Sequence, residues 1–255
     1  MPGRTPDDFD STRYARSEIA KYEAIYGRNF ISTGGARTSA EFLARLGLAR
    51  EMRVLDIGCG VGGCAIQMAR DYGVTVDGID ISRNMIEIGR ERCAEAGLDD
   101  RVRLLHGDVL EMQPGGRYDA VHSRDVFLHI HDKERLFAFI HRLLVPGGVL
   151  AFTDYCRGDR PPNEEFDAYV KERNYCLHTL DEYRRLLRRV GLDRIRVEDR
   201  TRQFIEIHRR ELEDLPAGAL GAEIADDMTR AWTAKIRRAR GGAQHWGWFG
   251  ARRPG

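Results

Sequence analysis

One stretch constrains the fold of this chain more than any other: Val54-Leu55-Asp56-Ile57-Gly58-Cys59-Gly60-Val61-Gly62-Gly63. A short apolar run containing an acidic residue gives way to closely spaced glycines, and residues 65–70 that follow are good helix formers. This order predicts a strand, a tight turn and a helix. Glycines let a ligand approach the backbone without a Cβ in the way, and helix N-termini favour electron-rich groups. We therefore expect a ligand-binding turn here, with an incidental glycine-rich turn as the alternative.

The glycines follow the acid in the order D-x-G-x-G-x-G, which resembles the first motif of class I S-adenosylmethionine (SAM) methyltransferases. A G-x-G-x-x-G match alone is weak, because NAD enzymes share it. SAM carries a sulfonium and an amino acid end but no pyrophosphate. A carboxylate at the strand tip, here Asp56, suits the cationic amino acid end and would repel a diphosphate.

Composition excludes several classes of protein. The 255 residues are 42% hydrophobic and carry a net charge of +1, so a sizeable core is possible and no global charge favours nucleic acid or an acidic membrane surface. The five cysteines show neither a C-x-x-C pair nor zinc-type spacing. We find no apolar stretch of membrane-spanning length and no signal peptide. We expect a cytoplasmic monomer without a bound metal, a membrane span or a nucleic-acid partner.

Acidic residues also end the next two predicted strands. The strand at residues 74–80 ends in Asp80, which can accept both ribose hydroxyls of an adenosine cofactor, and Ile81 can cover the adenine. The strand at 102–106 is followed by Asp108, which is placed to bind the adenine amino group. NAD enzymes also bind the ribose with an acidic residue at this position. Three acidic strand tips, at Asp56, Asp80 and Asp108, match the SAM pattern better than the NAD pattern.

The fourth predicted strand, residues 118–123, is followed by Asp125 and His129. Ligands of open α/β sheets bind beyond the carboxyl ends of the strands, so we expect this stretch to face the transferred methyl group. The two residues share a face if the segment is helical, because they are four positions apart. Alternatively, His129 is a packed histidine and Asp125 a helix cap.

The alternation of elements indicates the fold class. Helices are predicted at residues 11–26, 40–48, 133–144, 164–175, 180–190, 204–212 and 224–239, and further strands at 149–154, 195–197 and, as a final edge strand, 245–249. Such alternation is typical of a parallel sheet with helices on both faces. We predict an α/β fold with a doubly wound, mostly parallel, seven-stranded sheet.

The chain resembles, more specifically, the phosphoethanolamine N-methyltransferase family, and above all its compact single-domain type. The resemblance runs from about Tyr14 to Phe249. Its carrying stretches are Tyr22-Glu23 through Gly27, Phe30 to Gly35, Val54 to Gly63, Gly78 to Ile81, Ser123-Arg124-Asp125, Leu128-His129, Thr153 to Cys156, Tyr169 to Tyr175, Lys235-Ile236 and Trp246 to Phe249. The family often has Tyr where this chain has Phe30 and Trp248, which can alter substrate breadth.

The resemblance implies one Rossmann-like domain over residues 1–255, with an N-terminal helical lid at 1–35, a SAM-binding core at 50–156 and inserted substrate-binding helices within 157–255. It also implies three groups of site residues. Those at the reacting nitrogen are Tyr14, Asp125 and His129. Those that bind the cofactor are Ile31, Ser32, Asp56, Gly58, Gly60, Asp80, Ile81, Asp108, Val109 and Arg124. Those that bind the substrate and its phosphate are Tyr22, Tyr155, Tyr169, Arg173, Tyr175 and Lys235.

The chemistry suits these residues. A primary amine has a pKa of ~10.4, so only about one molecule in a few thousand is neutral at pH 7 and able to attack. His129 is a suitable proton acceptor, Tyr14 can hold it or the amine, and Asp125 can hold the ammonium. We expect SAM-dependent N-methylation of phosphoethanolamine and its mono- and dimethyl forms toward phosphocholine, with S-adenosylhomocysteine as the second product. The alternatives are methylation of another small amine or of a phosphonate oxygen, a non-catalytic SAM-binding protein, and an NAD-dependent oxidoreductase.

Overall fold

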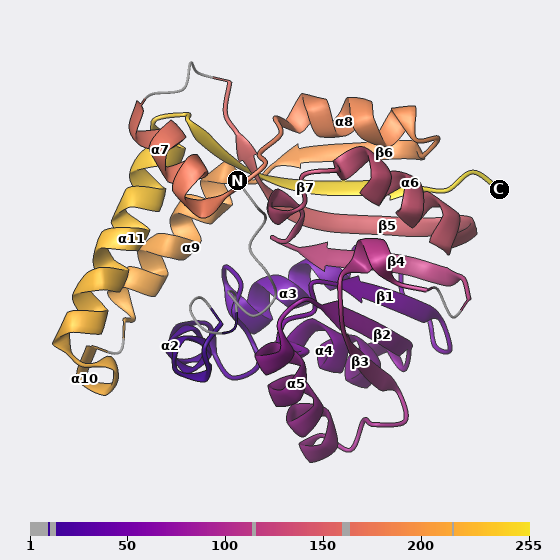
Figure 1. Ribbon diagram of the computed structural model, residues 1–255, viewed down its shortest axis with the longest axis horizontal. Helices are drawn as coiled ribbons and strands as arrows, with labels where there is room; N and C mark the ends of the chain where they lie inside the picture. Colours follow the sequence, from indigo (N-terminus) through magenta and orange to yellow (C-terminus); the bar gives the residue numbers. More distant parts are fainter. Residues whose placement is uncertain (1–9, 11–13, 114–115, 160–163, 216) are drawn as a thin grey trace. The chain divides into compact units, whose positions relative to one another are not determined.

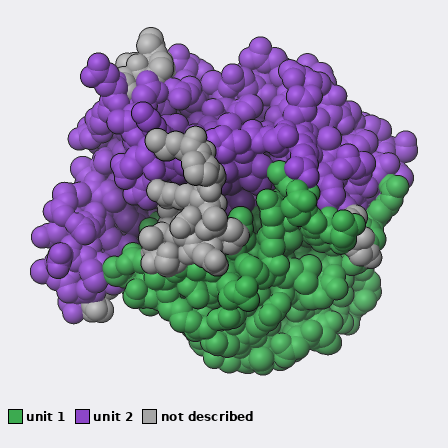
Figure 2. Space-filling view, in the orientation of Figure 1, with its two compact units in different colours: residues 1–122 green, residues 123–255 purple. Residues whose placement is uncertain are grey.

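The computed structural model describes residues 10, 14–113, 116–159, 164–215 and 217–255. Seven strands form one sheet in the order β3-β2-β1-β4-β5-β7-β6 (Figure 1), which confirms the predicted fold class. The chain divides into two compact units, residues 1–122 and 123–255 (Figure 2). Residues 1–9 and 11–13 of the predicted lid lie outside the described residues. The lid, the single-domain organisation and the boundaries at residues 50 and 156 stay predictions.

The first unit carries the glycine-rich stretch. Its elements are α2 (Arg16–Tyr26), α3 (Gly35–Leu43), β1 (Arg53–Ile57), α4 (Gly63–Tyr72), β2 (Thr75–Asp80), α5 (Arg83–Glu95), β3 (Val102–His106) and the short 3-10 helix η1 (Val109–Glu111). Strand β2 pairs in parallel with both β1 and β3, so that Asp56 lies opposite Gly78 and Asp80 opposite His106. The strand, turn and helix predicted over residues 54–70 are confirmed, with β1 and α4 at their two ends.

Glycine is required at Gly78 for packing beneath the turn. A Cβ at this position would lie 2.6 Å from Cδ2 of Leu104 and 2.9 Å from the Cβ of Cys59. Such distances are well inside van der Waals contact, so any side chain would push the glycine-rich turn away from the sheet. Cys59 is buried in this contact.

The second unit begins within β4 (Tyr118–Arg124). Its further elements are η2 (Phe127–His129), α6 (Lys133–Leu143), β5 (Leu144–Arg157), α7 (Glu164–Arg173), α8 (Leu180–Arg189), β6 (Asp193–Asp199), α9 (Thr201–Glu213), α10 (Ala217–Leu220), α11 (Ala222–Arg240) and β7 (Gln244–Arg252). Helices α9 and α11 lie side by side (Figure 1). An aromatic core includes Phe152 stacked on Phe249, with ring centroids 4.5 Å apart.

The prediction that residues 245–249 form an edge strand is wrong. Strand β7 runs antiparallel between β5 and β6, with Phe249 opposite both Phe152 and Val197. Trp246, Trp248 and Phe249 are all buried. Side chains on both faces of this strand are therefore covered, as expected for an interior strand and not for an edge.

Several predicted boundaries also shift. Helix α2 begins at Arg16, so Tyr14 lies before it. Helix α3 ends at Leu43, five residues before the predicted end, and β5 begins at Leu144, five before the predicted start. Asp125 and His129 are not on one helix face, because η2 covers only residues 127–129 and Asp125 has a left-handed φ of 55°. Asp tolerates that conformation better than most residues.

Candidate functional site

The glycine-rich turn of the first unit holds the side chain of Asp80. The amide of Gly60 donates to Oδ2 of Asp80 at 2.9 Å, and the amide of Ser82 donates to Oδ1 at 2.9 Å. The amide of Gly58 donates to the carbonyl of Ile79 at 2.8 Å, which ties the turn to β2. Burial raises the pKa of Asp80. Each carboxylate oxygen keeps acceptor capacity beyond one hydrogen bond, so Asp80 is oriented in advance to accept a ligand's hydroxyl groups.

Asp56 forms a buried pair with a histidine that the sequence analysis did not identify. Nδ1 of His122 lies 2.7 Å from Oδ1 of Asp56, and both side chains are almost inaccessible to solvent. Oδ2 of Asp56 is buried, and no hydrogen bond reaches it from the described residues. Buried carboxylate oxygens normally have a donor, so this orphaned acceptor fits a cationic N–H donor from a ligand. Nothing local in the sequence marks the pair, because 66 positions separate its members.

Two predicted site residues cover the inner face of the turn. Tyr14 and Ile31 pack against one buried cluster, which consists of Ile19, Val61, Met85 and Ile88. Gly60, at a φ of 54°, leaves room for Ile31, because a Cβ there would lie 3.1 Å from Cδ1 of Ile31. The carbonyl of the neighbouring Ser32 accepts from the amide of Gly35 at 3.0 Å. The first unit therefore brings Tyr14, Ile31 and the turn into one region.

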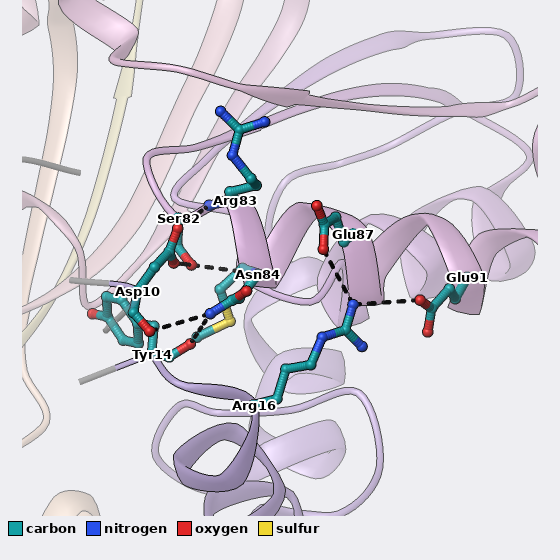
Figure 3. A network of polar contacts seen from close by, with 9 residues as sticks. Asp10, Tyr14, Arg16, Ser82, Arg83, Asn84, Glu87 and Glu91 are labelled. Atoms are coloured by element: carbon teal, nitrogen blue, oxygen red, sulfur yellow. Dashed lines mark hydrogen bonds and ion pairs between the residues drawn. The ribbon is translucent and has the colours of Figure 1, made fainter. Parts of the chain in front are cut away.

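Asp10 and Tyr14 both contact residues at the start of α5 (Figure 3). The Asp10 carboxylate accepts from the amide of Arg83 at 2.9 Å and from the hydroxyl of Ser82. Nδ2 of Asn84 donates to the carbonyls of Asp10 at 3.2 Å and of Tyr14 at 3.0 Å. A carboxylate at a helix N-terminus is electrostatically favourable. Asp10 and Tyr14 are thus both held at the start of α5, which begins three residues after Asp80.

The other cofactor candidates of the first unit have separate structural roles. Nε2 of His106 lies 3.1 Å from the carbonyl of Ile81. Asp108 is exposed and caps η1 by accepting from the amide of Leu110 at 2.8 Å, while Val109 is buried. Tyr22, a predicted substrate residue, stacks on Tyr26 with ring centroids 6.2 Å apart.

In the second unit, Asp125 presents one engaged and one unengaged carboxylate oxygen. Oδ1 accepts from the hydroxyl of Thr153 and from Nε1 of Trp246, each at 2.8 Å. Oδ2 is buried, and none of the described residues donates to it. Two fixed donors hold the carboxylate in one orientation, so the remaining oxygen is available to a cationic ligand. The Arg124 side chain beside it is buried at the end of β4.

His129 lies in a loop held by a buried lysine. Nζ of Lys133 donates to the carbonyls of Phe127 at 2.7 Å, Ile130 at 2.9 Å and Cys176 at 2.6 Å. The amide of Cys176 donates to the carbonyl of Leu128 at 2.7 Å. Burial lowers the pKa of Lys133. These bonds join the His129 loop to the segment after α7, and place the ring of His129 edge-on to Tyr175 with centroids 5.1 Å apart.

Asp154 supports the same loop from β5. Its carboxylate accepts from the hydroxyl of Tyr183 and from the amide of Leu128, the latter at 3.2 Å. The side chain is fully buried, and burial raises the pKa of Asp154 to about 7. Asp154 and Lys133 thus stabilise the backbone on both sides of His129.

The predicted phosphate ligands form a cluster of aromatic and cationic side chains in this unit. The guanidinium carbon of Arg173 lies 5.9 Å from the ring centroid of Tyr169, and Tyr169 packs edge-on to Tyr175 at 5.7 Å. Nζ of Lys235 lies 5.8 Å from the ring centroid of Tyr155. The structure therefore gathers all five predicted phosphate ligands in the second unit.

Lys235 has neighbours that the sequence analysis missed. Its Nζ lies 4.7 Å from the ring centroid of Trp232 and 3.5 Å from Nε2 of the fully buried His208. Nδ1 of His208 lies 2.9 Å from the carbonyl of Phe204 and donates to it, which leaves Nε2 as an acceptor for the ammonium. Burial lowers the pKa of Lys235 to about 8. Only the spacing of α9 against α11 brings these residues together.

The candidates thus fall into two groups by unit. The first unit holds Tyr14, Tyr22 and most cofactor candidates, and the second holds Arg124, Asp125, His129 and the phosphate candidates. The pairing of Tyr14 with His129 stays a prediction. Across the described ranges, no group of three or more His, Cys, Asp or Glu side chains is arranged to hold a metal ion. Within the same ranges, no helix is both long and apolar enough to cross a membrane.

Curated proteins that are similar to this chain include phosphoethanolamine N-methyltransferases. The chain is 38% identical to a phosphoethanolamine N-methyltransferase of Triticum aestivum, over 94% of this chain and 48% of the relative. It is 29% identical to that of Plasmodium falciparum, over 95% of this chain and 94% of the relative. The chain spans about half the length of the curated plant relatives it matches.

A solved structure gives a similar result. Haemonchus contortus phosphoethanolamine N-methyltransferase 2, in complex with phosphomonomethylethanolamine and S-adenosylhomocysteine, superimposes with a TM-score of 0.95 at 33% identity, covering 99% of this chain and 61% of that one. The predicted resemblance is confirmed. The model of the family described as "Methyltransferase domain" matches residues 32–197, more than half of the chain. The chain therefore belongs to the methyltransferase domain family.

Proposed function

We propose that the protein transfers methyl groups from SAM to the nitrogen of phosphoethanolamine and of its mono- and dimethyl forms, toward phosphocholine. One observation carries the proposal. The second unit combines a buried, unengaged carboxylate oxygen on Asp125 with a cluster of cations around Tyr169. Although burial lowers the pKa of Lys235, the negative charge of Asp125 raises it, so Asp125 lies close enough to the cation cluster to interact with it electrostatically. A substrate with an ammonium at one end and a phosphate at the other matches this arrangement.

The residues of the first unit fit SAM. The orphaned Oδ2 of Asp56 suits the cationic amino acid end, and the oriented carboxylate of Asp80 suits the ribose hydroxyls. Gly58 and Gly60 keep the turn free of side chains, and the remaining candidates are Ile31, Ser32, Ile81, Asp108, Val109 and Arg124. When bound, SAM supplies the methyl group and leaves as S-adenosylhomocysteine. Solved structures of the Haemonchus contortus relative with each of these two compounds support this assignment.

Residues around Asp125 bind the substrate ammonium and remove its proton. Asp125 holds the substrate ammonium through Oδ2, and its fixed Oδ1 keeps the carboxylate from rotating. His129 accepts the proton that the amine must lose before it attacks. Lys133 keeps His129 in place, and Tyr14 assists by hydrogen bonding to His129 or to the amine. Much of the catalysis is then alignment, as expected for an in-line displacement.

The aromatic and cationic side chains of the second unit bind the substrate phosphate. Arg173 offers a planar fork of donors, Lys235 a point charge, and Tyr155, Tyr169 and Tyr175 offer hydroxyl donors. Tyr22 of the first unit is proposed to line the same substrate pocket. Aromatic rings also tolerate a methylated ammonium through cation–π contact, so the methylated intermediates remain acceptable substrates. The free state of all five cysteines supports a reducing, cytoplasmic location, and we further propose that the protein acts as a monomer.

One experiment tests the function directly. The protein is incubated with methyl-labelled SAM and, separately, phosphoethanolamine, its mono- and dimethyl forms, ethanolamine and aminoethylphosphonate. We expect label in the three phosphorylated amines and little in ethanolamine. Labelling of ethanolamine at the same rate would contradict the phosphate cluster, and labelling of the phosphonate alone would replace the proposed substrate. Light scattering on the same preparation measures the oligomeric state.

A further inference from the structure

The side chain of Arg238 lies in the phosphate cluster but belongs to none of the predicted groups. It is on α11 and only 9% exposed. Its guanidinium carbon lies 3.8 Å from the ring centroid of Tyr169, closer than that of Arg173 at 5.9 Å. Two guanidinium groups therefore contact one tyrosine ring. Stacking on an aromatic face leaves the edge of a guanidinium free to bind an anion.

The guanidinium of Arg238 has more donors than partners. Its Nε donates to Oε1 of Gln244 at 3.2 Å, which is its only hydrogen bond to the described residues. A guanidinium carries five N–H donors, so the donors on its two terminal nitrogens have no acceptor from this part of the chain. These terminal nitrogens are not among the fully buried polar atoms that lack a partner, so an acceptor from outside the chain can reach them. Such an acceptor would satisfy them.

The surrounding charge favours an anion as that acceptor. The positive charges of Arg238 and Arg173 both lower the pKa of Lys235. Two of the nearby carboxylates are already engaged, because Glu165 pairs with Arg237 and Glu211 accepts from Nε1 of Trp232 at 2.7 Å, and the third, Asp125, is assigned to the substrate ammonium. Three cations then lie close enough to repel one another, and a doubly charged anion offsets that repulsion better than a neutral or singly charged group.

We propose that Arg238 is a further binding residue for the anionic end of the substrate, acting with Arg173 and Lys235. The inference rests on the proposed function in taking that end to be a phosphate monoester. Arg238 then helps to select phosphorylated amines over unphosphorylated ones. It touches the phosphate and not the reacting nitrogen, so its loss weakens binding of the substrate more than it slows methyl transfer.

The test compares Arg238→Gln with Arg237→Gln, a matched control. Arg237 is the neighbouring residue on α11, but its side chain is 65% exposed and pairs with Glu165 outside the cluster. Initial rates at saturating SAM give kcat and KM for phosphoethanolamine, calorimetry gives the affinity for inorganic phosphate, and thermal melting with S-adenosylhomocysteine binding reports folding. We expect Arg238→Gln to raise KM about tenfold or more, which is about 1.4 kcal/mol per factor of ten, while kcat changes about twofold at most. Affinity for inorganic phosphate should fall in parallel, and Arg237→Gln should match the wild type.

The outcomes separate the inference from the proposed function. A folded Arg238→Gln protein with unchanged KM and phosphate affinity would overturn the role of Arg238 while leaving the activity intact. A wild type that binds S-adenosylhomocysteine and phosphate but methylates none of the amines would overturn the function, and loss of phosphate binding in Arg238→Gln would still support the anion site. If Arg238→Gln does not fold, Arg238→Lys decides. It keeps the charge but not the planar fork, so KM should still rise several-fold, and an unchanged KM overturns the proposal.

Discussion

Replacing Lys133 with methionine tests how the loop around His129 is held. Methionine has a similar length but cannot donate hydrogen bonds. The substitution removes the three bonds from Nζ to the carbonyls of Phe127, Ile130 and Cys176. Two of these carbonyls flank His129 and the third directly follows Tyr175. We therefore expect both stability and turnover to fall.

The magnitude follows from the geometry. Hydrogen bonds from a charged donor contribute about 1.5–3 kcal/mol each, so the three bonds give roughly 4.5–9 kcal/mol before other terms. The buried ammonium itself costs several kcal/mol of desolvation, which agrees with the lowered pKa of Lys133. A net loss of about 3–5 kcal/mol is typical when one partner of a buried charged contact is removed. For a chain of this size the loss corresponds to a fall in Tm on the order of 10 °C.

The assay measures thermal melting without ligand and turnover per folded molecule on the same preparation. Lys171→Met is the control, because Lys171 is an exposed lysine of α7; surface changes of this kind usually shift stability by at most about 0.5 kcal/mol. Turnover of Lys133→Met should fall roughly a hundredfold if His129 moves by about 1 Å. A Lys133→Met protein that melts within about 2 °C of the wild type would refute the reasoning, because so small a shift means less than about 1 kcal/mol.

Three further predictions concern Asp125, Lys235 and Asp154. Asp125→Asn keeps the shape but loses the charge that holds the ammonium, so KM for phosphoethanolamine should rise about tenfold, since hydrogen bonds to charged groups contribute about 1.5–3 kcal/mol; an unchanged KM in steady-state kinetics would contradict this role. Lys235, with its pKa lowered to about 8, is charged below that pH and neutral above it. The kcat/KM of the wild type should therefore decline above pH 8, and a Lys235→Gln variant with the same declining limb would assign the decline elsewhere. Asp154 has a folded-state pKa of about 7, raised from 3.8, so between these values the folded protein binds more protons than the unfolded chain, and stability falls as pH rises. Urea unfolding at pH 5 and pH 8 should show a loss of a few kcal/mol that Asp154→Asn lacks.

The sequence alone determined those features that depend on neighbouring residues. The run from Val54 to Gly63 specifies strand, turn and helix, because an apolar segment, positive-φ glycines and helix formers follow one another directly. Asp80 lies at the end of β2, where the pattern placed it, and the sheet was predicted from alternation of the elements. The resemblance to the methyltransferases was carried by short motifs of the same local kind.

Only the tertiary structure decided which distant residues meet. The pairing of Asp56 with His122 spans 66 positions, and the bond from Lys133 to Cys176 spans 43. Strand β7 lies inside the sheet because it pairs with β5 and β6, and no property of residues 244–252 alone specifies those neighbours. In the sequence, nothing distinguishes Arg238 from the other basic residues at the end of the same predicted helix. Arg238 is buried against Tyr169 because α11 lies against α7. The spacing of residues within one helix does not specify which other element that helix packs against.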